Sequence, residues 1–144
     1  MKTYGFGIIG CGMISDFHSA AIADIKNGKL VAVSSRKSEN SQRLVDRYSI
    51  QAYSDYNEML SREDIDIVCI CTPSGAHMEP AVAAAEAGKH VIIEKPLEIT
   101  LERCDSISNP VRRRMSGYAL YSTPVLVMPA NWSKRQFLVA GLDS

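Results

Sequence analysis

Short apolar runs alternate with segments of helical periodicity up to about Pro110, and this rhythm constrains the fold more than any other feature. The apolar runs contain few polar residues, which is typical of strands that are buried on both faces. Strands that are separated by helices in this way form a parallel sheet with helices on both faces. The sequence therefore predicts an α/β fold with a Rossmann-type doubly wound parallel sheet. The expected strands are residues 6–9, 30–33, 51–53, 67–71 and 90–94, and the expected helices are residues 14–25, 39–48, 55–60 (capped by Ser54), 76–87 and a last helix from Thr100 to Pro110.

The overall composition excludes several classes of protein. The 144 residues suffice for one domain, and 46% hydrophobic and 22% charged residues are ordinary for a soluble protein. No apolar run is long enough to cross a bilayer, and the glycines before Asp16 interrupt the apolar stretch that a signal peptide needs. The cysteines lack the spacing of a zinc site, so we expect no metal and predict buried thiols in a reducing cytoplasm: Cys11, Cys69, Cys71 and Cys104.

A loop with the sequence GCGMIS begins at Gly10, where the first strand is expected to become the first helix. Gly10 permits a tight turn, and Gly12 lets the backbone approach a pyrophosphate. The free N–H groups of the helix N-terminus, at Met13 and Ile14, would bind that anion. The third position of the motif holds Ser15 rather than Gly or Ala. The loop predicts dinucleotide binding, and a simple structural turn is the alternative.

The loop after the second expected strand indicates which dinucleotide binds. An NAD-dependent enzyme usually places Asp or Glu there, so that a carboxylate accepts from the ribose 2′-hydroxyl. Here Ser35 and Arg36 stand at this place, and the first acid is Glu39. Hydroxyl and guanidinium groups suit a 2′-phosphate better than a free ribose diol. We therefore predict NADP in preference to NAD, with a solvated basic loop as the alternative.

Two later segments, taken together with the glycine loop, resemble a known family. One is Thr72-Pro73-Ser74-Gly75-Ala76-His77 after the fourth strand, and the other is AGKHVIIEKPL from Ala87 to Leu97. With GCGMI at Gly10, these motifs resemble the glucose–fructose oxidoreductase / inositol dehydrogenase / MocA family (Gfo/Idh/MocA). The resemblance covers roughly residues 4–105. It implies that residues 1–105 are the NAD(P)-binding Rossmann domain of an oxidoreductase.

The resemblance implies roles for five residues. Thr72 and Pro73 would border the nicotinamide half of the cofactor, and His77 would lie near its ribose or phosphates. Lys95 would be the catalytic residue, because it would reach the nicotinamide ribose and the substrate carbon. A cation there would stabilise the alkoxide character that develops on a sugar hydroxyl. Glu94 would either hold Lys95 or contact the ribose, and the sequence leaves both open.

The resemblance also implies a second, C-terminal α+β domain that binds substrate and contributes an Asp and a His to proton transfer. After Pro96 this chain has Asp105 and Asp143 but no histidine. We therefore expect an inactive fragment, with hydride transfer between NAD(P) and a sugar, polyol or inositol-type hydroxyl only in a full-length protein. The expected partner here is a small dinucleotide, and a homo-oligomer stays open. The alternative function is a non-catalytic, NAD(P)-sensing regulatory module.

Residues 106–144 differ from the rest of the chain. Residues 1–105 carry 11 Lys and Arg against 15 Asp and Glu, whereas 106–142 have five basic residues and no acid. Family likeness ends near Asp105, so we predict an atypical, poorly ordered tail that arises from a shifted reading frame. The alternative is a genuine tail whose apolar run, 124–128, adds an edge strand. Nucleic-acid binding through Arg112–Arg114 is disfavoured, because this patch is short and the net charge is zero.

Overall fold

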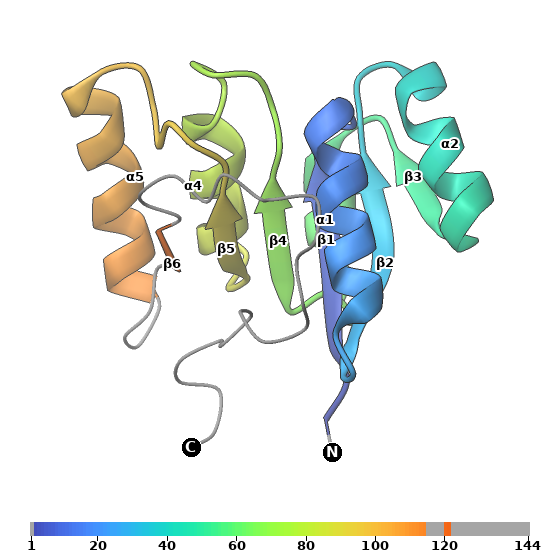
Figure 1. The fold of residues 1–144 in the computed structure, drawn as a ribbon. Coiled ribbons are helices and arrows are strands. Elements are labelled where there is room, and N and C mark those ends of the chain that lie inside the picture. The colour runs from blue at the N-terminus through green and yellow to red at the C-terminus, as the bar shows by residue number, and fades with distance from the viewer. Residues whose placement is uncertain (1, 115–119, 122–144) are drawn as a thin grey trace.

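Helices and strands follow one another in the predicted order (Figure 1). The computed structural model describes residues 2–114 and 120–121. The strands are β1 (Tyr4–Ile9), β2 (Gly28–Ser34), β3 (Gln51–Tyr53), β4 (Ile67–Ile70), β5 (His90–Ile93) and β6 (Leu120–Tyr121). The helices are α1 (Met13–Asp24), α2 (Ser38–Tyr48), α3 (Tyr56–Leu60), α4 (Met78–Glu86) and α5 (Leu101–Arg114).

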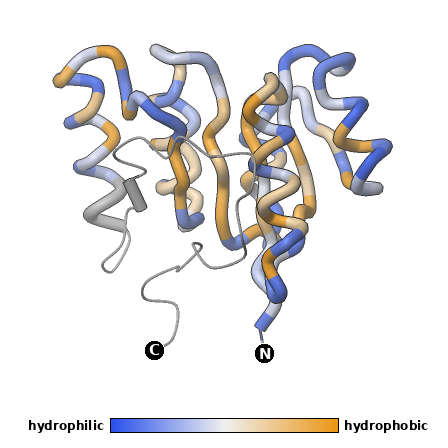
Figure 2. The backbone as a smooth tube through the Cα atoms, viewed as in Figure 1, coloured by the Kyte–Doolittle hydropathy of each residue, from blue (hydrophilic) through white to orange (hydrophobic). Residues whose placement is uncertain are grey.

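The strands form one parallel sheet in the order β3-β2-β1-β4-β5-β6. The chain builds the sheet outward from β1 in one direction and then, from β4, in the other, which is the predicted doubly wound topology. Buried side chains form two clusters, one on each face. Helices α1 and α2 cover one face, and α3, α4 and α5 cover the other. Figure 2 shows the central strands as largely hydrophobic between helices of mixed character.

The sequence places the apolar residues Ile14, Phe17, Ala21 and Ile25 at helical spacing, but the buried side of α1 is a different one. The buried residues of this helix are Ser15, Ser19 and Ile22, whereas Ile14 and Phe17 are 38% and 54% exposed. Small side chains let the helix approach the sheet closely, and the Ser19 hydroxyl is satisfied by a 2.7 Å bond to the Ser15 carbonyl. Hydrophobic spacing thus predicted the helix correctly but not the face that it buries.

Two helix ends also differ from expectation. Asp55, rather than Ser54, caps α3, because its carboxylate accepts a backbone N–H of the first turn. Thr100 does cap α5, with a 3.3 Å bond from a first-turn N–H. However, α5 does not end at Pro110 but continues to Arg114. It also crosses the domain boundary that the sequence suggested at residue 105.

Packing explains why α5 continues past its proline. Ile107 is 1% exposed and belongs to the cluster that contains the inner residues of α4. Proline removes one helical hydrogen bond. The hydroxyls of Ser106 and Ser108 donate to carbonyls of the preceding turn at 2.9 Å each. Tertiary packing therefore outweighs local helix propensity here.

The loops that follow β1, β4 and β5 meet at one edge of the sheet. The N–H groups of Gly10, Cys71 and Glu94 each donate to the last residue of a neighbouring strand, at 2.9, 2.7 and 3.1 Å. The winding direction reverses between β1 and β4, and in open α/β sheets ligands bind in the crevice outside the carboxyl ends of strands at such a point. The predicted site residues all belong to loops or helix starts at this edge.

The remaining expectations concern cysteines and the end of the chain. Cys11, Cys69 and Cys71 are buried as predicted, and Cys104 is half-buried. Strand β6 pairs with β5, whereas the expected edge strand at 124–128 and most of the expected tail lie outside the described residues. Within the described ranges, no group of three or more His, Cys, Asp or Glu could hold a metal ion. No helix in that part of the chain is both long and apolar enough to cross a membrane.

Candidate functional site

Gly10 lies where the loops after β1 and β4 touch. Its φ is +95°, in the region that favours glycine. A Cβ at this position would lie 2.6 Å from the carbonyl carbon of Cys71 and 2.6 Å from the nitrogen of Thr72. Both contacts are with backbone, which cannot rotate away. Only glycine therefore fits, and the two loops form one tight crossing at the crevice.

Gly12 lies on the open side of the same loop and caps α1. It has an extended backbone conformation, and a Cβ added to it would meet no atom within 4 Å. No side chain caps the first turn of the helix, and Met13 and Ile14 there are exposed, Met13 to 80%. A helix N-terminus with free N–H groups and open space in front of it fits an anion such as a pyrophosphate.

The loop after β2 presents polar groups and no acid. Ser35 is tied into the sheet edge through its N–H, which donates to the Tyr53 carbonyl at 3.0 Å. The Ser35 hydroxyl accepts from the Lys37 N–H at 3.3 Å, and Arg36 is exposed. The first acid after β2 is Glu39, in the first turn of α2. The charge at this end of the crevice is therefore positive, as a 2′-phosphate requires.

Arg43, on α2, reaches the glycine loop and was not singled out from the sequence. Its guanidinium donates to the carbonyls of Cys11 and Gly12 at 3.0 and 2.7 Å. It also forms an ion pair with Asp16 at 3.0 Å. No sequence motif marks such a residue, because the contact joins two helices whose approach depends on the folded sheet.

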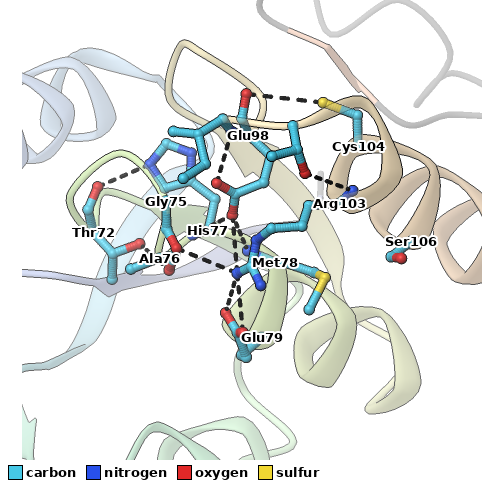
Figure 3. A network of polar contacts seen from close by, with 12 residues as sticks. Thr72, Gly75, Ala76, His77, Met78, Glu79, Glu98, Arg103, Cys104 and Ser106 are labelled. Carbon is cyan, nitrogen blue, oxygen red and sulfur yellow. Dashed lines mark hydrogen bonds and ion pairs between the residues drawn. The ribbon is translucent and has the colours of Figure 1, made fainter.

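His77 is buried and bridges two loops of the site (Figure 3). Its Nε2 lies 2.8 Å from the Thr72 carbonyl, and its Nδ1 lies 2.9 Å from the Pro96 carbonyl and 3.2 Å from that of Leu97. Whichever ring nitrogen carries the proton, the imidazole donates to one of these loops. With 1% exposure, the ring is enclosed between the two loops. Its nearness to the ribose or phosphates of a cofactor stays a prediction.

Glu98 is a second residue that the sequence did not indicate, and its side chain is fully buried beside His77. Its carboxylate accepts from the N–H groups of His77, Met78 and Ile99 at 3.2, 3.1 and 2.8 Å (Figure 3). Arg103 of α5 approaches the same carboxylate at 3.3 Å. Burial alone would raise the pKa of Glu98, but these hydrogen bonds and the guanidinium lower it below its usual value. The carboxylate therefore joins α4, α5 and the loop after β5.

Glu94 is held by a histidine of α1. Its Oε1 lies 2.7 Å from Nε2 of His18, and its Oε2 accepts from the Lys95 N–H at 3.2 Å. Burial would lower the pKa of His18, but contacts with the sulfurs of Cys69 and Cys71 and with Glu94 raise it above its usual value. The hydrogen bond from His18 correspondingly lowers the pKa of Glu94 against the effect of burial.

These contacts agree with one of the two roles that the sequence left open for Glu94, that of holding Lys95, while contact with the ribose stays a prediction. Its carboxylate holds the Lys95 backbone, while the Lys95 side chain is exposed at the crevice. His18, which no sequence motif singled out, connects the helix of the glycine loop to this segment. The Lys95–Pro96 peptide bond is cis. The predicted residues thus gather at the ends of β1, β2, β4 and β5. His18, Arg43 and Glu98 make hydrogen bonds to the segments that contain them.

Comparison with known proteins identifies the family to which this chain is similar. A model of the Gfo/Idh/MocA family, described as "Oxidoreductase family, NAD-binding Rossmann fold", matches residues 4–119. The match extends beyond the predicted boundary at residue 105. The chain is 36% identical over 104 residues to inositol 2-dehydrogenase of Salmonella typhimurium, which is 70% of this chain and 31% of that protein. It is 32% identical over 107 residues to 2,7-anhydro-N-acetylneuraminate hydratase of Mediterraneibacter gnavus, covering 74% of this chain and 28% of that protein.

A solved structure is similar over the same part of the chain. The WlbA dehydrogenase of Bordetella pertussis, crystallised with NADH and UDP-GlcNAcA, superposes with a TM-score of 0.75 and 30% identity. The superposition covers 78% of this chain and 33% of WlbA. The chain therefore spans about a third of the length of the relatives that it matches. The matched part is the parallel sheet whose edge carries the glycine loop, and the chain belongs to the Gfo/Idh/MocA family of oxidoreductases, whose NAD-binding Rossmann fold it contains.

Proposed function

We propose that a nicotinamide dinucleotide binds in the crevice at the carboxyl ends of β1, β2, β4 and β5, and that the loop after each of these strands contributes residues. The observation that carries this proposal is Gly12, which has open space in front of it and leads into a helix start without a capping side chain. The pyrophosphate is held by the N–H groups of Met13 and Ile14, on a turn that Gly10 makes possible. Thr72 and Pro73 border the nicotinamide half, while Glu94 holds the segment that contains Lys95.

The dinucleotide is NADP(H) in preference to NAD(H). Support comes from the loop after β2, where Ser35 and the exposed Arg36 replace the carboxylate that accepts from a free 2′-hydroxyl. A phosphate dianion gains charge-assisted hydrogen bonds from a guanidinium, whereas a neutral diol gains little. Removal of Arg36 is therefore expected to affect NADP far more than NAD.

In the full-length protein, the reaction is hydride transfer between NAD(P) and a sugar, polyol or inositol-type hydroxyl. The inositol in the name of one relative and the UDP-GlcNAcA bound in the structure of another support this substrate class. When bound, the nicotinamide supplies the hydride acceptor or donor. Lys95 is the catalytic residue: its exposed ammonium stabilises negative charge on the substrate oxygen, and Glu94 fixes its backbone. We assign the selection and holding of the substrate to a further domain, as the resemblance to the family implies.

Calorimetry with NADP⁺ and NAD⁺ tests the proposal on this chain. We expect saturable binding of both, with NADP⁺ tighter, and a selective loss of NADP⁺ affinity in Arg36→Ala. Arg47→Ala removes an exposed arginine from the last turn of α2 and serves as the charge-matched control. Absence of binding by either dinucleotide contradicts the proposed site, whereas tighter NAD⁺ contradicts only the preference.

The assay for catalysis needs the full-length protein. Cofactor reduction with a polyol or sugar that is abolished by Lys95→Ala supports the enzyme. Dinucleotide binding without turnover of any tested polyol or sugar instead indicates the NAD(P)-sensing module. The isolated chain is expected to give no turnover, because hydride transfer requires a substrate held next to the nicotinamide, a task that we assign to a further domain of the full-length protein.

A further inference from the structure

Arg43 makes three hydrogen bonds to residues of the glycine loop. Its Nη1 donates to the Cys11 carbonyl at 3.0 Å, and its Nη2 donates to the Gly12 carbonyl at 2.7 Å and the Ser15 hydroxyl at 3.2 Å. Its side chain is nevertheless 40% exposed. Among the side chains described, those of residues 2–110, no other Lys or Arg has a hydrogen bond to this loop. Arg43 is therefore a cation that lies on the loop and is open to solvent.

Besides the glycine loop, Arg43 contacts the carboxylate of Asp16. Nε lies 3.1 Å from both carboxylate oxygens, and Nη2 lies 3.0 Å from Oδ2. This edge of the guanidinium, with two parallel N–H groups, is the one that binds planar anions and phosphates in a fork. Asp16 is itself 36% exposed and stands in the first turn of α1. An anion that reached this edge would compete with Asp16 for the same two donors.

The place of Arg43 agrees with the adenosine end of a dinucleotide. Its guanidinium touches Cys11 and Gly12, which precede the proposed pyrophosphate site at the start of α1. Its own helix, α2, begins directly after the loop that holds Ser35 and Arg36. Arg43 thus lies between the pyrophosphate site and the 2′-phosphate site. In the Rossmann fold, the ribose of the adenosine half spans this interval.

We propose that Arg43 is a specificity-determining residue that binds the 2′-phosphate of NADP together with Arg36, and that Asp16 occupies its forked edge when no nucleotide is bound. The proposal rests on the proposed function of the crevice. On binding, the phosphate replaces Asp16 at Nε and Nη2, while the bonds to the Cys11 and Gly12 carbonyls keep the guanidinium in place. Two residues then discriminate NADP from NAD, namely Arg36 after β2 and Arg43 on α2.

Two mononucleotides isolate this contact. Adenosine 2′,5′-bisphosphate and 5′-AMP differ only in the 2′-phosphate, so the ratio of their dissociation constants measures its recognition. A forked phosphate contact corresponds to roughly tenfold in affinity or more. We expect Arg43→Ala to weaken 2′,5′-bisphosphate binding at least that much and 5′-AMP binding by less than about threefold. Arg43→Lys keeps the charge but not the fork, and is expected to fall between. Circular dichroism and thermal unfolding show that each variant is folded.

Asp16 provides the complementary test. Asp16→Asn removes the competing carboxylate, so the preference for the 2′-phosphate should rise, and Arg43→Ala in the same chain should cancel that rise. Equal weakening of both mononucleotides by Arg43→Ala overturns the proposal and leaves Arg43 as a support of the loop. A wild-type chain that binds both mononucleotides equally also overturns it, although dinucleotide binding then stands. A wild-type chain that binds no NADP⁺, NAD⁺ or mononucleotide refutes the proposed function itself.

Discussion

Replacing Gly10 with alanine is expected to destabilise the fold by about 2–5 kcal/mol, and the structure supplies both parts of this figure. The φ of +95° places a side chain in the left-handed region, which costs roughly 1–2 kcal/mol. The new Cβ would lie 2.6–2.7 Å from the backbone of Cys71 and Thr72. Forcing an extra group into such a packed contact costs about 1–3 kcal/mol more. The total is a large part of the roughly 5–15 kcal/mol that stabilises an ordinary domain.

Urea unfolding of Gly10→Ala, with Gly12→Ala as its matched control, measures this cost. The midpoint for Gly10→Ala should fall by roughly 1–2 M. Gly12 has φ −80° and nothing within 4 Å, so its alanine variant should keep its stability to within about 0.5 kcal/mol. Gly12→Ala should instead weaken dinucleotide binding, because the methyl group occupies the space in front of the helix. Equal destabilisation by the two variants, or a Gly10→Ala variant as stable as the wild type, would refute the reasoning.

Three further predictions follow from the polar contacts behind the site. The pKa of His18 is raised in the folded state, so its contact with Glu94 stabilises the fold fully below about pH 6.5, the pKa of an unfolded histidine, and less as the pH rises. His18→Gln should therefore remove this decrease of the unfolding free energy with pH. The same decrease in the variant would contradict the contact. The pKa of Glu94 is lowered in the folded state, so its contacts lose their stabilising effect as the pH falls below about 4.3, the pKa of an unfolded glutamate. Acid unfolding followed by circular dichroism should show this loss in the wild type but not in Glu94→Gln. Glu98→Ala leaves three backbone N–H donors without their partner, one of them in a buried hydrogen bond, and should cost about 3 kcal/mol or more in chemical denaturation. Glu102→Ala, at an exposed position of α5, should cost little. Similar values for both variants would contradict the role of the buried carboxylate.

The sheet was predictable because each strand carries a local signal. Runs such as residues 67–71 are continuous and apolar, glycines mark the turns, and the regular spacing of helices leaves few alternatives to a parallel doubly wound sheet. The glycine loop was predictable for the same reason, since Gly10 and Gly12 stand directly at the first strand–helix junction. What failed locally was the buried face of α1, where small serines rather than the larger apolar residues approach the sheet.

The supporting residues of the site were not predictable, because their partners are distant in sequence. His18 meets Glu94 across 76 positions, and Arg43 meets Gly12 across 31. Glu98 could have drawn attention as an acid among apolar residues directly after the family motif, but its four donors become apparent only when α4 and α5 pack together. The bridging contacts of His77 were not predictable for the same reason, since only the fold shows that its ring is enclosed between two loops.

The most direct test of the central claim is the titration of NADP⁺ into the ¹⁵N-labelled chain, with backbone amide shifts recorded residue by residue. We expect saturable shifts of the backbone amides that follow four strand ends, in residues 10–15, 35–36, 72–77 and 94–97. The opposite edge of the sheet has a polar hollow lined by Lys29, Gln51 and Arg62, among others, which serves as an internal reference. Shifts centred on that hollow, or no saturable shifts at any residue, would contradict the claim that the crevice at the carboxyl ends of the strands binds the dinucleotide.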